Sequence, residues 1–430
     1  MRRVVGPLLL AGLIGAAPTT APDETAKLVA LYKDLHARPE LGFQETVTAA
    51  RLAKEIAGLG FEITTGVGKT GIVAVLRNGP GPVLLIRADM DGLPVSEETG
   101  LPYASKATGI GTDGKPTPTM HACGHDIHMS AWVGLARRLA VTRSGWSGTV
   151  VMIGQPAEEG VGGAAAMLAD GLYSRFPKPN FALAFHDSAS LPAGQVGITD
   201  GYALANVDSM DILVRGIGSH GSEPQNGIDP IVIAARIVGT LQTLVSREND
   251  PRQPAVVTVG TFHGGTKRNI ISNEANLELT IRSYDPDVRK RLVASIRRVA
   301  KAEAEAAGVS PDLLPVVTMG DGSESTFNTP VGTRTVTAAL DAALGRDRVI
   351  RVLPSMAAED FGAFSRGFGG VESVMFWVGA QPRAVWDAAG GDPRKLPGLH
   401  SSKFAPDPGP TIATAVDAMQ AAAMSVVGKK

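Results

Sequence analysis

Apolar runs of five to seven residues alternate with longer stretches of helical spacing over most of the chain. The runs are continuous rather than alternating, and the first two are flanked by glycine and proline, which is typical of strands buried on both faces. They occupy residues 71–77, 82–87, 149–154 and 181–185. Apolar residues recur at helical spacing in residues 26–36, 45–59 and 127–139. The pattern predicts an α/β domain.

A second pattern interrupts the first in the middle of the chain. Residues 207–214 alternate as a strand, and the segments that follow read helix, strand, strand, helix and strand, over residues 229–246, 255–262, 275–283, 286–307 and 313–319. The order βαββαβ is that of the split βαβ, ferredoxin-like arrangement. At 430 residues the chain also exceeds the size at which a single core stops growing. We therefore predict one domain from residues 22–203 and 321–430, with a second domain, 204–320, inserted into it.

Charge and cysteine content exclude some classes of function. The chain has 41 Lys and Arg against 42 Asp and Glu, and it has no dense basic run with interleaved aromatic residues. Nucleic acid is therefore not an expected partner. A single cysteine excludes an internal disulfide, so the redox compartment cannot be inferred from disulfide bonds.

The amino terminus indicates export. Basic residues at the start are followed by an apolar stretch, residues 4–17, which is too short for a stable membrane anchor and ends among small residues. We interpret residues 1–21 as a secretory signal, with a buried N-terminal strand as the alternative. The protein is then expected to be periplasmic or secreted, with no membrane contact after the signal is removed.

The segment Met120–His128 contains the only cysteine and three of the eight histidines. A thiolate at Cys123 and an imidazole at His125 can bind one Zn²⁺, or Mn²⁺ and Co²⁺ less tightly. Gly124 between them allows the backbone to turn both side chains the same way. His128 lies within the following helix, where a hydrogen-bonded structural role is at least as plausible as a metal-binding one.

Two adjacent glutamates, Glu158 and Glu159, follow the strand at 149–154 on an irregular turn. Neighbouring side chains on such a turn diverge, so one glutamate can bind a metal while the other faces the attacking water. Asp89 and Asp91 follow the strand at 82–87, at the end of a strand where α/β sheets commonly present chemistry. Helix capping is the alternative for these two aspartates.

These motifs, in this order, resemble the M20 family of metallopeptidases, and most closely its subfamily D. That branch contains hippurate hydrolases, N-acyl-amino-acid amidohydrolases and auxin-conjugate hydrolases. The residues that carry the resemblance are the segments Arg87–Pro94, Met120–His128, Gly154–Gly160, His220–Ser222 and Leu399–Phe404. The resemblance implies a mixed-sheet metallohydrolase domain with helices on both faces, and a ferredoxin-like lid as the inserted domain.

The resemblance also implies a dinuclear metal site, with two ions of Zn, Mn, Co or Ni. Its ligands would be Cys123, His125, Glu159, His186 and His400. A lone histidine after an apolar strand is otherwise commonly structural, so His186 and His400 depend on this likeness. Glu158 would be the general base, and Asp89 and Asp91 would support the ligands from behind.

The lid would supply residues for the substrate. In the resembled family the histidine matching His220 polarises the scissile carbonyl, while Asn269 and Arg282 match residues that hold polar groups of the substrate; exposed surface residues are the plain alternative for all three. The family also suggests a homodimer through the lid, with His220 delivered to the partner's site. Glycine and serine at 221–222, serine at 272 and aspartate at 187 depart from the usual pattern and leave the substrate open.

The expected reaction is hydrolysis of the amide bond of an N-acyl amino acid, or of a short peptide with a free carboxylate. Glu158 would take a proton from water and return it to the leaving amine. A carboxypeptidase or dipeptidase is the alternative within enzymes, and a periplasmic metal-binding or peptide-binding protein is the alternative outside them. A serine hydrolase is not supported, because the chain has no G-x-S-x-G motif.

Overall fold

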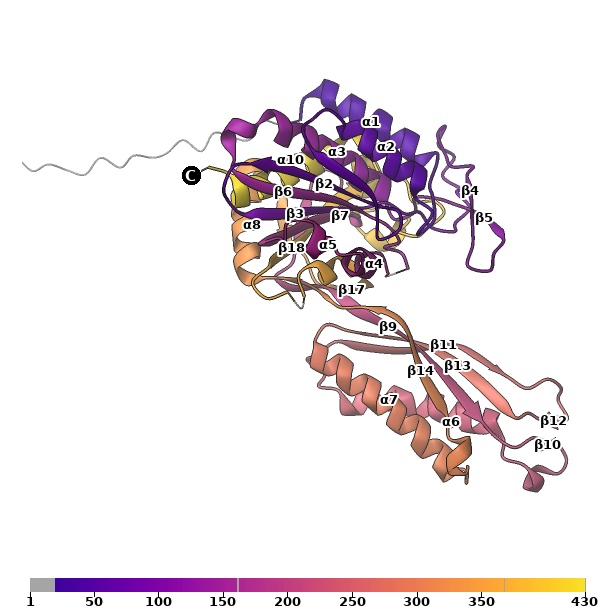
Figure 1. Cartoon of the computed structure of the whole chain (residues 1–430). Coiled ribbons are helices and arrows are strands. Elements are labelled where there is room, and N and C mark those ends of the chain that lie inside the picture. Colours follow the sequence, from indigo (N-terminus) through magenta and orange to yellow (C-terminus); the bar gives the residue numbers. More distant parts are fainter. Residues whose placement is uncertain (1–19, 161, 367, 430) are drawn as a thin grey trace, which may run out of the picture.

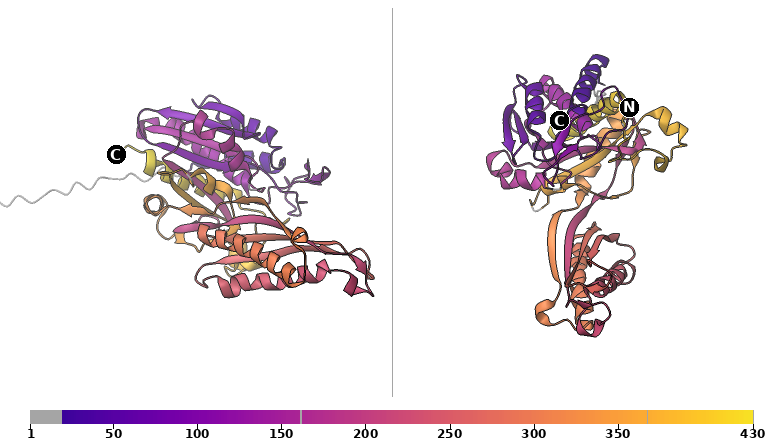
Figure 2. Two further views of the ribbon diagram at one scale, coloured as in Figure 1. Left: turned by 60° about the horizontal axis from the view of Figure 1, so that its bottom comes forward. Right: turned by 90° about the vertical axis from the view of Figure 1, so that its right-hand side faces the viewer.

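A computed structural model describes residues 20–160, 162–366 and 368–429. The predicted signal, residues 1–21, lies outside the described residues except for its last two positions. The chain forms a larger and a smaller body, joined by the long strand β9 (Gly201–Arg215) and by β14 (Val316–Ser323) (Figure 1). Figure 2 shows the smaller body projecting from one side of the larger one. Among the described helices, none is both long and apolar enough to cross a membrane.

The larger body is built on an eight-stranded sheet in the order β1-β2-β6-β3-β7-β18-β8-β16. The central strands β6, β3, β7 and β18 run parallel to one another, whereas β1, β2 and β8 pair in antiparallel fashion. The predicted mixed sheet is confirmed. Its strands are β1 (Glu62–Val67), β2 (Gly71–Asn78), β3 (Val83–Asp89), β6 (Gly148–Gln155), β7 (Phe181–Pro192), β8 (Val196–Ile198), β16 (Val349–Arg351) and β18 (Glu372–Gln381).

Helices cover both faces of this sheet because successive residues of its buried strands point to opposite sides. On β3, Leu84 and Ile86 enter one apolar core, and Leu85 enters the other. The first face packs against α1 (Pro22–His36), α2 (Thr46–Ile56), α3 (His125–Val141), α8 (Pro330–Leu344) and α10 (Pro408–Val427). The second packs against α4 (Gly163–Ala169), α5 (Leu172–Arg175) and the 3₁₀ helix Asp360–Phe364.

The smaller body is an antiparallel sheet in the order β11-β13-β9-β14, with two helices on one face. In the chain its elements are β9, α6 (Pro230–Thr243), β11 (Ala255–Gly264), β13 (Glu274–Ser283), α7 (Pro286–Ala306) and β14. The predicted βαββαβ order is confirmed. The predicted domain boundaries at residues 204 and 320 fall within β9 and β14, which run on into both bodies; near the larger body, β9 also pairs with β15 (Thr326–Asn328) and β17 (Ser355–Ala358).

Residues 107–119 contain a small ribbon of β4 (Thr108–Ile110) and β5 (Pro116–Pro118). One local expectation was wrong. The strand preceding His186 does not end there: β7 continues to Pro192 because β18 pairs with it along nearly its whole length. His186 therefore lies inside a strand rather than at its end.

Candidate metal centre

The start of α3 places Cys123 and His125 side by side. Gly124 caps the helix with a φ of 76°, and a Cβ at this position would lie 2.3 Å from a carboxylate oxygen of Asp187, so glycine is required. The Nδ1 atom of His125 lies 2.8 Å from the backbone oxygen of Asp91. A carbonyl oxygen only accepts, so Nδ1 carries the proton and Nε2 is left free for a metal.

The two glutamates are held by a turn whose N–H groups bind buried carboxylates. Ala157 has a φ of 44°, which is uncommon for a residue with a side chain. Its N–H donates to Glu45 at 2.7 Å, and the N–H groups of Glu158 and Glu159 donate to the two oxygens of Asp91 at 3.1 and 3.0 Å. The predicted divergence of the two side chains is observed.

Glu159 turns toward the cysteine, with an oxygen that lies together with Cys123 and His125 in one group of potential ligand atoms. Glu158 instead joins Asp89 and Glu359 in a second group. Both glutamates also approach Nε2 of His125, at 3.9 Å for Glu159 and 3.8 Å for Glu158. The two glutamates thus turn to different sides of the centre, Glu159 toward Cys123 and Glu158 toward Asp89 and Glu359.

His186 and His400 approach the cysteine from two other segments. Nε2 of His186 is 3.6 Å from Sγ of Cys123, and its Nδ1 bonds the backbone oxygen of Asp187. Nε2 of His400 is 3.3 Å from Sγ of Cys123 and 3.4 Å from Glu159. His400 has a φ of 67°, and its N–H donates to the backbone oxygen of Ala122. The structure therefore brings all five predicted ligands together.

The unpaired atoms and the charge of this cluster fit a metal. Nε2 of His125 and Oε1 of Glu159 are buried without a hydrogen-bond partner among the described residues. Burial raises the pKa of the Cys123 thiol, and the carboxylates of Glu159 and Glu158 raise it further. Burial likewise raises the pKa of Glu159 to about 8. A buried group of acids with too little positive charge is stabilised by divalent cations, and the thiolate and imidazole donors suit zinc or a similar ion.

Arg87 holds the back of the centre through buried ion pairs. Its guanidinium donates to Asp89 and Glu359, each at 2.6 Å. Glu359 also caps the following 3₁₀ helix through the N–H of Phe361, and Asp360 accepts from the N–H of Ala164. The ion pairs of Arg87 with Glu359 and Asp360 were not predicted, because nothing in the local sequence connects residues so far apart.

Two other histidines have their ring nitrogens fully used. His128 bonds Asp89 through Nδ1 and Asp187 through Nε2, which agrees with a structural role. His36 is the last residue of α1, and its two ring nitrogens contact the carboxylates of Asp126 and Glu97.

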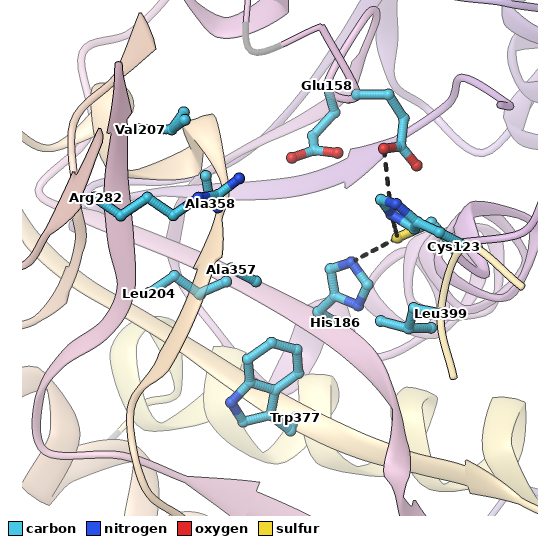
Figure 3. A pocket seen from close by; sticks show the side chains of 12 residues that line it. Cys123, Glu158, His186, Leu204, Val207, Arg282, Ala357, Ala358, Trp377 and Leu399 are labelled. Atoms are coloured by element: carbon cyan, nitrogen blue, oxygen red, sulfur yellow. Dashed lines mark hydrogen bonds and ion pairs between the residues drawn. The ribbon is translucent and has the colours of Figure 1, made fainter. Parts of the chain in front are cut away.

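A cavity of about 480 Å³ opens in front of the cluster (Figure 3). Arg282, on β13 of the smaller body, lines the side of the cavity across from Cys123 and His186. The sequence did not reveal Trp377, which lines the same space with its ring centroid 5.5 Å from that of His186. Trp377 pairs with His186 across β18 and β7, and such pairing of distant parallel strands has no local signal. The remaining lining residues are Glu158, Glu159, Leu204, Val207, Ala357, Ala358, Leu399 and His400.

His220 and Asn269 are not brought to this cavity. His220 lies on β10 (Ser219–His220), which pairs with β12 (Ile270–Ile271) at the outer end of the smaller body (Figure 1). Both residues are exposed, and Nδ1 of His220 is hydrogen-bonded to the hydroxyl of Ser222 at 2.7 Å. Within one chain, the residues predicted to act on the substrate therefore divide into Arg282 inside the cavity and His220 and Asn269 outside it.

Comparisons with known proteins agree with this site. The chain is 34% identical over 369 residues to N-acetylcysteine deacetylase of Bacillus subtilis, covering 84% of this chain and 90% of the relative. It is 35% identical to hippurate hydrolase of Campylobacter jejuni, covering 77% and 82%, and 35% identical to thermostable carboxypeptidase 1 of Saccharolobus solfataricus, covering 78% and 82%. The crystal structure of a dinuclear metal-binding peptidase of the M20 family from Bacillus subtilis superposes with a TM-score of 0.74 at 28% identity, covering 94% of this chain and 99% of that one. The profile of peptidase family M20/M25/M40 matches residues 85–385, and the chain belongs to this family of hydrolases.

Proposed function

We propose that this protein hydrolyses the amide bond of N-acyl amino acids, or of short peptides, that carry a free carboxylate. The observation that carries the proposal is that Arg282 lines the cavity without a carboxylate partner. Its guanidinium lines the cavity, and among the described residues its hydrogen-bond partner is the backbone oxygen of Met356, at 3.0 Å, with no carboxylate within ion-pair distance. Partial burial lowers the pKa of Arg282. A desolvated cation beside a hydrolytic centre is suited to bind the carboxylate of a substrate.

The centre supplies the other parts of the reaction. Cys123, His125, Glu159, His186 and His400 would hold two divalent ions. Bound there, such ions would polarise the amide carbonyl and lower the pKa of water. Glu158 lies on the cavity wall, and burial followed by the charge of Glu359 raises the pKa of its carboxyl group. Glu158 is thereby suited to accept a proton from the attacking water and to return it to the leaving nitrogen.

A substrate panel tests the role of Arg282. N-acyl amino acids, dipeptides and their C-terminal amides are assayed with metal-loaded protein. A hydrogen bond to a charged group contributes about 1.5–3 kcal/mol, so the amides should react roughly 10- to 100-fold more slowly. Replacement Arg282→Met should remove most of this preference, whereas the exposed arginine replacement Arg346→Met should retain it. Equal rates for acids and amides in the parent would contradict the proposal.

A carboxypeptidase or dipeptidase is the second candidate, because one relative is a carboxypeptidase and a peptide also ends in a carboxylate. The panel distinguishes the two activities directly. Higher kcat/KM for N-acyl amino acids than for dipeptides with the same carboxyl-terminal residue supports the amidohydrolase, and the reverse order supports the peptidase.

We further propose that His220 acts in a second copy of the chain. Its position at the outer end of the smaller body leaves it outside the cavity of its own chain, and β11 and β14 offer sheet edges for pairing. Glu158→Ala and His220→Ala proteins, each inactive, are mixed under conditions of subunit exchange. Delivery to the partner restores about a quarter of the parent rate, because half the dimers are mixed and one of their two sites is complete. If no activity is recovered although subunit exchange is verified, the proposal that His220 acts in a second copy of the chain is contradicted.

Export of the protein is also proposed, on the basic and apolar pattern of residues 1–21. Mass spectrometry of the exported protein should give a first residue between about 17 and 24. Retention of Met1 in the exported protein would contradict the signal.

A further inference from the structure

A second cavity, of about 360 Å³, adjoins the metal centre. It shares Ala357, Trp377 and Leu399 with the cavity in front of the ligands. Its remaining walls are the end of β7, the start of β17 with the segment before it, and Gly398. The residues are Ser188, Ala189, Ser190, Leu191, Val352, Leu353, Ser355 and Gly398. All of its lining residues belong to the larger body. The shape of this cavity is therefore independent of the position of the smaller body.

Because Ala357, Trp377 and Leu399 line both cavities, the second cavity lies next to the space in front of the proposed ligands. Leu399 precedes His400 in the chain, and the ring of Trp377 packs against His186. An amide carbon held at the centre would therefore lie close to the boundary between the two cavities. One of its two substituents can extend past Trp377 and Leu399 into the second cavity.

The chemistry of the two cavities indicates which substituent this is. Leu191, Val352, Leu353 and Trp377 make the second cavity largely apolar, three serines add neutral polar groups, and no charged side chain is among its described lining residues. The charged end of the substrate has a partner in the other cavity, at Arg282. The uncharged half of the substrate, its acyl group, therefore fits the second cavity.

The volume limits the size of that group. A space of about 360 Å³ equals roughly twelve water molecules at about 30 Å³ each. An acetyl group has three non-hydrogen atoms and would leave most of it to solvent. A benzoyl or octanoyl group, with eight or nine, would fill much of the space and bury apolar surface.

We infer that the second cavity binds the acyl group of the substrate and favours acyl groups of benzoyl or octanoyl size over acetyl. The inference rests on the proposed hydrolysis of N-acyl amino acids and names the class of acyl group that this site takes. Trp377 and Leu399, at the junction of the two cavities, would contact the first carbons of the chain, and Leu353 would contact its end at the rim.

Binding of a matched series tests the inference without requiring turnover. Acetyl-, butanoyl-, hexanoyl-, octanoyl- and benzoylglycine are titrated calorimetrically into metal-loaded Glu158→Gln protein. Burying one methylene contributes about 0.8 kcal/mol when complete, so affinity should rise roughly two- to fourfold per added methylene as far as octanoyl. Benzoylglycine should bind at least tenfold more tightly than acetylglycine.

Substitutions of two residues at the rim of the second cavity test whether the acyl group binds there. Leu353 is 88% exposed and Ser190 is exposed, so Leu353→Glu and Ser190→Trp should fold normally. Each should weaken octanoylglycine at least tenfold and acetylglycine less than twofold. The control is Val141→Glu, which adds the same charge at an 80% exposed position at the far end of α3 from the ligands, and it should change neither affinity.

The outcomes separate this inference from the proposed function. Affinity that stays flat or falls with acyl length, or rim variants that weaken both ligands equally, would overturn the acyl site even if the parent hydrolyses the series. The expected gradient and rim effects would support the acyl site even if the parent hydrolyses none of it, and the proposed function alone would then be rejected.

Discussion

The ion pair network at His36 makes stability depend on pH in a defined direction. The side chain is fully buried, with Nδ1 at 2.6 Å from Asp126 and Nε2 at 3.1 Å from Glu97. Burial by itself lowers the pKa of His36, but the hydrogen bonds to Asp126 and Glu97 outweigh it and raise the pKa to about 10. The histidine is therefore charged in the folded protein at neutral pH and largely neutral in the unfolded chain.

The direction in which stability changes with pH follows from proton linkage. The folded state holds this proton more tightly than the unfolded state, whose histidine pKa is about 6.5. The contribution of charged His36 to the free energy of unfolding is fully present below pH 6.5 and is lost as the pH rises toward 10. One pKa unit equals about 1.4 kcal/mol, so the difference corresponds to about 5 kcal/mol, of the same order as the cost of removing one partner from a buried ion pair.

The perturbation is His36→Gln, and the measurement is denaturant unfolding of parent and variant at pH 6, 8 and 10 with a metal chelator present. All four tryptophans lie in the larger body, at positions 132, 146, 377 and 386, so their fluorescence reports its unfolding. The variant should be about 3–5 kcal/mol less stable at pH 6. The gap should narrow by more than about 2 kcal/mol by pH 10.

The exposed His263 provides the matched control, because His263→Gln should leave stability equal to that of the parent at all three pH values. A gap between parent and His36→Gln that stays constant from pH 6 to pH 10 would refute a charged His36 in the folded protein.

Three further predictions concern the centre. Glu158→Ala should abolish turnover and keep the metal content of the parent, whereas Glu159→Ala should also lose metal; equal metal loss in elemental analysis would reject this division of roles. Cys123 should resist alkylation with metal bound and react after chelation, and rapid labelling of the metal-loaded protein would count against its being a ligand. Glu45→Ala should lower metal affinity and the melting temperature, because it leaves the N–H of Ala157 without its hydrogen-bond acceptor. Glu45→Gln can still accept that hydrogen bond and should largely retain both properties. Matching losses in the two variants would exclude this hydrogen bond as the cause.

The parts of the fold and site that depend on neighbouring residues could be predicted from the sequence. The segment from Cys123 to His128 specifies its own turn and helix, and the adjacent glutamates specify their own divergence. The βαββαβ order of the smaller body follows from hydrophobic period alone. These features required no knowledge of how distant strands pair.

The features of the site that were missed join distant segments. Trp377 reaches the centre because β18 pairs with β7. Arg87, on β3, meets Glu359, which caps the 3₁₀ helix Asp360–Phe364 far along the chain. Glu45 supports the turn at Ala157 from the start of α2. A buried carboxylate or an aromatic residue on a strand looks the same locally whether or not such a partner exists, so its role becomes visible only in three dimensions.

The most direct test of the metal centre is the anomalous diffraction signal of crystals grown with zinc, measured on either side of the zinc absorption edge. We expect two peaks per chain, enclosed by the five side chains that the structure brings together: Cys123, His125, Glu159, His186 and His400. The absence of bound zinc, or peaks held by His128 or by Asp89 with Glu359 instead, would contradict the assignment.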